Sequence, residues 1–233
     1  MVPILWPGSA STTNTSRPDR GGKSMMKLHV FPGSPRARKA LTVAYHLDLP
    51  IEVAAMDPRT GAHKQPEFLK LNPNGRIPVL EEDDFALWES NAIIQHLAEK
   101  KPGVLTPTDA KGRIQMAQWL AWDLAHWDSA WVMVIFETVV KQFLGRGEPD
   151  PARLKEGRER LDMAAKVLDG QLANNEFVLG DKLTVVDFAL AAPLSFAAMC
   201  QVSLEPYPHI ARWFRRIEAT EAWQKVPGLP VAA

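Results

Sequence analysis

The hydrophobic pattern changes its period once, near residue 103, and this change constrains the fold more than any other feature. Before it, short alternating runs that predict strands are interspersed with segments of helical spacing, whereas after it all apolar spacing is helical. The 233-residue chain is therefore expected to form a mixed α/β domain and then an all-helical domain, each long enough to bury a core. The expected boundaries are a tail (1–25), the α/β domain (26–101), a linker (102–110) and the helical domain (111–227).

The first domain is expected to follow the order βαβ, α, ββα. The first two strands should be parallel with a right-handed crossover, and the last two should form an antiparallel hairpin around an acidic turn. The predicted strands cover residues 27–31, 50–54, 77–80 and 85–87, and the predicted helices cover 35–47, 64–70 and 89–100.

Four helical segments are expected in the second domain, and one of them begins with a sharp local signal. Thr184 and Asp187 have the spacing of a capping box, in which the Thr184 hydroxyl can accept the Asp187 backbone N–H and the Asp187 carboxylate can accept the Thr184 backbone N–H. Leu183 and Phe188 flank this box at positions where two apolar side chains pack against each other. We interpret this pattern as structural, so that Asp187→Ala should damage folding rather than chemistry. The four segments are 112–144, 151–173, 184–200 and 208–218.

The first 24 residues differ in composition from the rest. Residues 9–24 are rich in Ser, Thr, Gly and Arg and are expected to be disordered. No basic segment precedes the short apolar start, so a signal peptide is not expected, and Met25 or Met26 is an alternative start. Gly22-Lys23-Ser24 resembles the end of a phosphate-binding loop, but Arg17 stands where that loop needs glycine and no strand precedes it.

Composition narrows the possible partners. Lys+Arg and Asp+Glu both number 27, which gives no support for a nucleic-acid or membrane-surface partner. No apolar run approaches the ~20 residues of a membrane helix. The single cysteine, Cys200, excludes an intrachain disulfide and fits a reducing, cytoplasmic location. The six histidines show no metal-ligand spacing, so no metal is expected.

Ser34 lies where the first strand runs into the first helix. Its simplest role is an N-cap hydroxyl, which is common at this position. The alternative is that the hydroxyl and the helix N-terminus stabilise an anion, and a thiolate would suit because a donor at such a site lowers a thiol pKa.

Two dipeptides later in the same domain also allow two interpretations. Ile77-Pro78 opens a strand; base rates favour a trans bond, but a cis bond would expose the Ile77 backbone N–H and C=O to a peptide ligand. Glu89-Ser90 begins a helix. Glu either complements the helix dipole or, together with Ser, presents a carboxylate, a hydroxyl and a free N–H to an amino-acid head group.

Four of the eight tryptophans fall in one stretch, which ends at Trp131. They either pack between helices or line an apolar pocket for an aromatic ligand. Trp119, Trp122 and Trp127 are the predicted pocket residues.

Taken in order, these motifs resemble the glutathione transferase superfamily over residues 26 to about 223, closest to serine-type, theta- and phi-like bacterial members. The resemblance implies the cytosolic fold of that superfamily, a thioredoxin-like βαβαββα domain followed by an all-helical domain. It rests on residues 31–39, 61–68, 72–80 with its cis-proline loop, 89–93 and 184–187.

The resemblance also implies residue roles. Ser34 donates to the glutathione sulfur, His63 and Lys64 meet the glycyl carboxylate, and Ile77 pairs with the cysteinyl backbone beside Pro78 and Arg76. Glu89 and Ser90 hold the γ-glutamyl head. Arg36 either assists thiolate formation or points to solvent.

The implied function is conjugation of glutathione, the co-substrate, to small, largely apolar electrophiles by a homodimer. The alternatives are another glutathione-dependent enzyme on the same fold (a peroxidase, dehalogenase or ether-cleaving member) and a non-catalytic glutathione- or ligand-binding protein.

Overall fold

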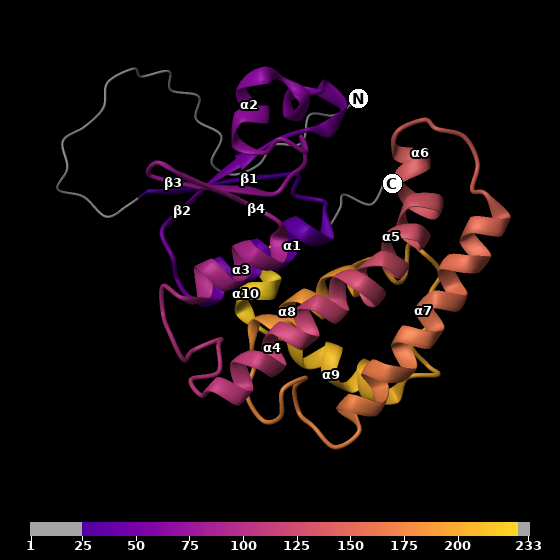
Figure 1. Ribbon diagram of the computed structural model, residues 1–233. Coiled ribbons are helices and arrows are strands. Elements are labelled where there is room, and N and C mark those ends of the chain that lie inside the picture. The colour runs from indigo at the N-terminus through magenta and orange to yellow at the C-terminus, as the bar shows by residue number, and fades with distance from the viewer. Residues whose placement is uncertain (1–24, 228–233) are drawn as a thin grey trace.

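The computed structural model describes residues 25–227. The expected disordered segment 9–24, with its phosphate-loop-like end, lies outside these residues. Figure 1 shows two parts: a sheet flanked by helices, and a larger group of helices beside it. No helix in the described part is both long and apolar enough to cross a membrane.

The N-terminal domain has the predicted topology. Its four strands have the order β2-β1-β3-β4, in which β1 is parallel to β2 and antiparallel to β3, and β3 is antiparallel to β4. Helix α2 lies on one side of the sheet, and α1 and α3 lie on the other (Figure 1). The elements are β1 (Met26–Val30), α1 (Pro35–His46), β2 (Ile51–Ala55), α2 (Pro66–Leu71), β3 (Val79–Glu82), β4 (Phe85–Trp88) and α3 (Ser90–Ala98).

Alternation decides which face of β1 is buried. Met26, Leu28 and Val30 are buried, whereas Lys27 and His29 between them are partly exposed. Leu28 lies opposite Val53 of β2 and Leu80 of β3. Two short 3₁₀ helices, η1 (Pro58–Thr60) and η2 (Ala62–Lys64), occupy the predicted loop 58–63 and the first residue of the predicted helix 64–70, and α2 begins only at Pro66.

The predicted helix 112–144 is one continuous helical run that begins at Ala110, but it contains two π-helical segments. A π turn inserts one extra residue and rotates every following side chain around the axis. Figure 1 shows the run crossing the molecule through α4, α5 and α6. Its parts are α4 (Ala110–Trp122), η3 (π, Asp123–Trp127), α5 (Asp128–Ile135), η4 (π, Phe136–Val140) and α6 (Lys141–Phe143).

The expected helix over 184–200 is wrong in length. Its α-helical part ends at Ala191 and continues as the 3₁₀ helix η5. Pro193 is the reason, because it has no N–H to donate to the preceding turn. The other helices are α7 (Pro151–Leu172), α8 (Val185–Ala191), η5 (Ala192–Phe196), α9 (Pro208–Glu218) and α10 (Glu221–Gln224), and α10 was not predicted.

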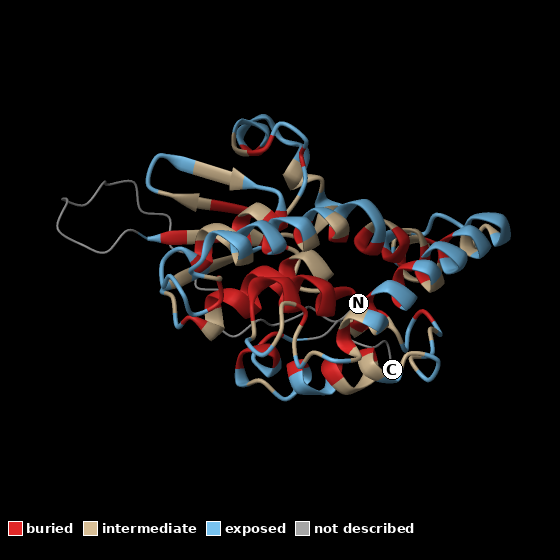
Figure 2. Cartoon of the chain, turned by 60° about the horizontal axis from the view of Figure 1, so that its bottom comes forward, coloured by how far each residue is buried: buried red, intermediate tan, exposed pale blue. Residues whose placement is uncertain are grey.

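The two domains share one core. Buried apolar side chains form a single cluster from β1 and α1 to the C-terminal helices. All seven residues of α8 are buried, and all of them except Asp187 belong to this cluster. Figure 2 shows these buried residues gathered at the centre of the molecule. Because α1 contacts α3 as well as α8, η5 and α10, it lies at the junction of the domains.

The capping box at the start of α8 is present. One oxygen of Asp187 accepts the Thr184 backbone N–H at 2.8 Å and the Thr184 hydroxyl at 3.0 Å. The other oxygen accepts the Val178 backbone N–H at 2.9 Å and the Trp213 indole N–H at 3.0 Å. Asp187 is wholly buried and joins three segments of the helical domain, which agrees with a structural role.

Candidate active site

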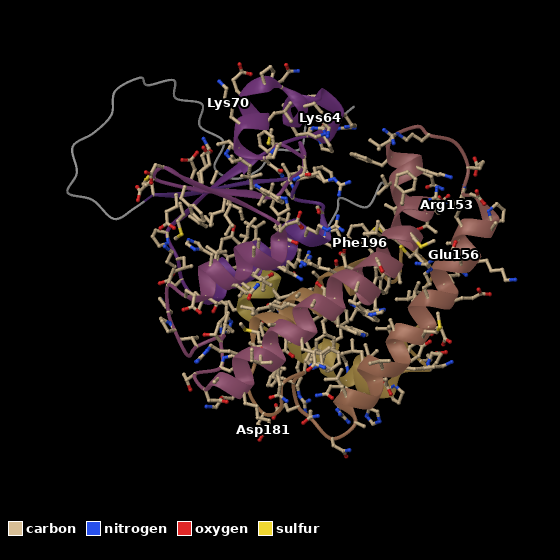
Figure 3. All side chains as sticks on the ribbon, in the orientation of Figure 1. Lys64, Lys70, Arg153, Glu156, Asp181 and Phe196 are labelled. Carbon is tan, nitrogen blue, oxygen red and sulfur yellow. The ribbon has the colours of Figure 1, made fainter. Side chains whose placement is uncertain are left out.

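A cleft of about 360 Å³ lies between the two domains at the N-terminal end of α1. One wall comes from the loops after β1 and β2, the opposite wall from α5, η4 and α6, and the floor from η5. Figure 3 labels Phe196, which lines the cleft from η5. The lining residues are Phe31, Gly33, Ser34, Pro35, Arg36, Pro58, Asp128, Trp131, Val132, Ile135, Phe136, Val139, Val140, Phe143, Leu144, Pro193 and Phe196.

Ser34 lines this cleft as the N-cap residue of α1. The turn after β1 is closed by a 2.9 Å bond from the Ser34 N–H to the Phe31 carbonyl, and Pro35 occupies the first turn of the helix. The Ser34 side chain makes no capping hydrogen bond, and no described residue bonds its hydroxyl. The hydroxyl and the unpaired first-turn N–H groups of α1 are therefore available to an anion.

Arg36 and Asp128 are the charged side chains among the described cleft residues. The Arg36 Nη2 donates to the Asp128 Oδ2, which joins the first turn of α1 to the first turn of α5. Arg36 therefore points across the cleft to the other domain, and the alternative that it points only to solvent is wrong.

The peptide bond between Ile77 and Pro78 is cis. The turn before it is held by the Asn72 side chain, which accepts the Asn74 N–H at 3.0 Å and donates to the Arg76 carbonyl at 2.7 Å. Neither the N–H nor the C=O of Ile77 bonds to a described residue, so both are free to pair with a peptide backbone.

Glu89 precedes α3 in a conformation that non-glycine residues rarely adopt, with φ 69° and ψ 112°. Ser90 is the first residue of α3 and is buried, whereas Glu89 is exposed. Strained backbone of this kind persists only where the surroundings impose it, and it concentrates at ligand sites.

His63 and Lys64 lie in η2, beside the turn that precedes Ile77. The Lys64 ammonium donates to the Asn74 carbonyl at 3.2 Å, whereas the buried His63 Nδ1 has no partner among the described residues. Burial, and then the neighbouring Lys64, lower the pKa of His63. Figure 3 labels Lys64 on the N-terminal domain. Arg76 is exposed in the same turn.

The three predicted pocket tryptophans do not line the cleft. Trp119 and Trp122 pack edge to face with ring centroids 5.0 Å apart, and Trp127 is buried and donates its indole N–H to the Leu190 carbonyl at 2.8 Å. The tryptophan that does line the cleft is Trp131, whose indole N–H has no partner in the described structure. Residues 123–127 are π-helical, which moves the later tryptophans to a different face of the run.

Sequence reasoning also missed the apolar wall of the cleft and a buried polar group at the junction of the domains. Val132, Ile135, Phe136, Val139, Val140 and Phe143 stand out as an apolar pattern, but the pattern alone predicts only a buried face. Between α1, α3 and η3, the buried Lys39 ammonium donates to the Asn91 Oδ1 at 2.6 Å, and the Asn91 Nδ2 donates to the Asp123 Oδ2 at 3.0 Å. Burial raises the pKa of Asp123. Together, Lys39, Asn91 and Asp123 join α1, α3 and η3.

Comparison with known proteins agrees with this architecture. The family models described as glutathione S-transferase N-terminal and C-terminal domains match residues 24–99 and 128–221. Glutathione S-transferase 3 of Zea mays is 33% identical over 214 residues, which are 88% of this chain and 95% of the relative.

Two solved structures are also similar. The glutathione transferase URE2P6 from Phanerochaete chrysosporium, in complex with oxidized glutathione, superposes with a TM-score of 0.79 at 29% identity, covering 87% of this chain and 94% of that chain. A glutathione S-transferase from Pseudomonas fluorescens has a TM-score of 0.77 at 28% identity, covering 84% and 96%. The chain belongs to the glutathione S-transferase family.

Proposed function

We propose that this protein is a serine-type glutathione transferase, in which Ser34 stabilises the thiolate of glutathione for attack on a small, largely apolar electrophile. The observation that carries the proposal is the free Ser34 hydroxyl at the N-terminus of α1, on the rim of an apolar cleft. A hydroxyl donor beside a helix N-terminus favours the charged form of a bound sulfur and lowers the thiol pKa.

The surrounding residues supply a site for the rest of the tripeptide. The free N–H and C=O of Ile77, beside Pro78, pair with the cysteinyl backbone, and Glu89 and Ser90 at the start of α3 bind the γ-glutamyl head. His63 and Lys64, with Arg76 in the adjacent turn, meet the glycyl carboxylate. The support is that η2 and the turn before Ile77 touch through the bond from Lys64 to Asn74.

The cleft beside Ser34 then holds the electrophile. Its volume of about 360 Å³ lies at the lower end of small-molecule sites, and its lining is almost entirely apolar. Holding the electrophile against the sulfur makes the attack effectively unimolecular, which adds to the lowered thiol pKa.

An ultraviolet titration of bound glutathione tests the role of Ser34. The wild-type protein should show thiolate absorbance at a pH well below the pKa of free glutathione. Ser34→Ala should return the thiol pKa toward its value in water, and Ser34→Thr, which keeps the hydroxyl, should stay closer to wild type. Bound glutathione that titrates as in water in the wild type would refute thiolate stabilisation.

A substrate panel separates the conjugating enzyme from the alternatives. Chlorodinitrobenzene, a hydroperoxide and an aryl ether report conjugation, peroxidase activity and ether cleavage, and we expect the first reaction to dominate. Glutathione binding without turnover of any of the three would instead favour a binding protein.

We also propose a homodimer in the cytoplasm. Phe85 and Trp88 are exposed on the edge strand β4, and Ile114 and Leu124 are exposed on α4 and η3, which leaves apolar surface for a second copy to cover. The free Cys200 is buried, which fits a reducing compartment. A monomer by light scattering would contradict the dimer. The bacterial origin stays a prediction.

A further inference from the structure

We propose that Arg36 binds the electrophile and stabilises the negative charge that develops on it during attack. The protein would then prefer aromatic acceptors in which oxygen receives that charge, such as nitroarenes and aromatic enones, over alkyl halides. This inference rests on the proposed function, because it assigns the substrate class of the same cleft.

The first argument is the composition of the cleft. Apart from the hydroxyl of Ser34 and the buried indole N–H of Trp131, its described side chains offer an incoming molecule aromatic and aliphatic surface and one cation, Arg36, with its partner Asp128. The rings of Phe31, Trp131 and Phe196 are part of that surface. Such a site recognises a flat apolar body that carries one anionic or electron-rich group.

The second argument is that the guanidinium of Arg36 keeps unused donors. A guanidinium carries five N–H donors, and the described structure gives Arg36 a single side-chain partner, the Oδ2 of Asp128, through Nη2. The side chain of Asp128 is 11% exposed and that of Arg36 is 38% exposed. The carboxylate is therefore the fixed member of the pair, and it holds a partly accessible cation at the cleft.

The third argument is position. Arg36 lies two residues after Ser34 on the first turn of α1, but its side chain reaches the opposite wall at the first turn of α5. An electrophile between these walls has the glutathione sulfur on the Ser34 side and the guanidinium on the α5 side. Asp128 therefore positions Arg36, and Arg36 contacts the substrate.

The chemistry of attack shows when this matters. With a chloronitroarene, the sulfur electron pair forms the C–S bond, and ring electrons move onto the nitro oxygens until chloride leaves with the C–Cl electrons. With an enone, the electrons move onto the carbonyl oxygen, and water then supplies a proton to the adjacent carbon. With benzyl chloride, the charge moves directly to chloride and no oxygen receives it. A donor aimed at developing oxyanion charge accelerates only the first two reactions.

The test compares kcat/KM for 1-chloro-2,4-dinitrobenzene with kcat/KM for benzyl chloride, at saturating glutathione, in wild type and Arg36→Met. Methionine keeps an unbranched side chain and removes the charge. We expect the ratio to fall by roughly 10-fold, which is less than the 10²–10³ measured for a fully enclosed donor, because Arg36 is partly exposed. The ratio for Arg36→Lys, which keeps the charge, should fall between those of wild type and Arg36→Met.

Two further variants serve as controls. Arg59 is a cation that does not line the cleft, although its guanidinium lies 4.7 Å from the ring centroid of Phe143, which does. Arg59→Met should therefore leave the ratio of the two kcat/KM values unchanged. Asp128→Asn keeps the guanidinium and should retain the preference for the nitroarene better than Arg36→Met does. It also provides a second measurement if Arg36→Met folds poorly.

Each outcome decides between specific roles. If both rates fall equally and the bound thiol pKa rises, then Arg36 acts on the thiolate and the proposal is overturned. An unchanged ratio in Arg36→Met makes the ion pair merely structural. If wild type turns over neither substrate and its bound thiol titrates as in water, the proposed function fails first, which is distinguishable from a failure of Arg36 alone.

Discussion

Replacing Asp187 with asparagine tests how the helical domain is held together, because the two side chains have nearly the same shape but different hydrogen-bonding capacity. The carboxylate accepts four hydrogen bonds, from the Val178 and Thr184 backbone N–H groups, the Trp213 indole and the Thr184 hydroxyl, at 2.8–3.0 Å. Each oxygen accepts two, and an ionised carboxylate offers nothing but acceptors.

The loss in stability follows from counting the donors that asparagine leaves unpaired. If its NH₂ group faces Thr184, the hydroxyl can rotate to accept, but the Thr184 backbone N–H loses its partner. If it faces the other way, the N–H groups of Val178 and Trp213 both lose theirs. At least one buried N–H is orphaned, which costs about 1–3 kcal/mol. Asp187→Ala orphans three N–H groups, so it should cost about 3 kcal/mol or more.

One effect opposes this loss. Burial raises the pKa of Asp187, since removal from water disfavours the charged form, and asparagine avoids that penalty. We expect the orphaned donor to outweigh it, because four donors converge on the carboxylate.

Thermal unfolding measures the result. For a chain of this size, about 2–4 °C per kcal/mol is expected, so Asp187→Asn should lower Tm by roughly 2–12 °C, and Asp187→Ala by at least about 6 °C. Asp181→Asn is the matched control, because Asp181 is exposed on the loop before α8 (Figure 3), and its change should stay within about 0.5 kcal/mol. If Asp187→Asn melts with wild type, the carboxylate does not satisfy these donors.

Three further predictions concern the glutathione site and the helical domain. Gly75→Ala should raise the KM for glutathione more than Gly61→Ala does. Both glycines have positive φ, but only at Gly75 would an added Cβ meet a neighbour, the His63 carbonyl oxygen at 2.9 Å, so equal changes in KM would contradict this reasoning. The pKa of His63 is lowered in the free protein, and a bound carboxylate would raise it, so affinity for S-methylglutathione should increase from pH 8 to pH 6 by calorimetry and lose this slope in His63→Gln. Burial, and then the 2.5 Å bond to Asp162, raise the pKa of Tyr207 to about 12, so the folded state keeps a proton that the unfolded chain loses near pH 10. The free energy of unfolding should therefore fall between about pH 10 and pH 12, and Tyr207→Phe should show a smaller loss of Tm over that pH range.

Features that depend on neighbours in sequence were predictable. The alternation of β1 placed Leu28 and Val30 in the core, and the spacing of Thr184 and Asp187 predicted the capping box. The turn before Ile77 is likewise made by residues within four positions of one another, such as Asn72 and Arg76. Interactions this local are visible in the residue order, because chain connectivity already brings the groups together.

The cleft was predicted less well, because its walls are distant in sequence. Apolar spacing over residues 112–144 predicted a helix with a buried face, but it did not say what that face would contact. The π segment over residues 123–127 changes the helical phase just before Trp131, and Trp131 rather than Trp127 lines the cleft. Pro58 and Phe196 join the lining only because the chain folds back on itself.

The amino-acid sequence by itself therefore determined the order of strands and helices in the N-terminal domain, the capping box at Thr184 and the turn before Ile77, and the glutathione transferase motifs. Tertiary structure alone decided which side chains meet across the two domains, including the pairing of Arg36 with Asp128, 92 residues apart. The physical reason is that backbone hydrogen bonding and capping act over a few residues, whereas contact between domains depends on how the shared core packs around α1 and α8.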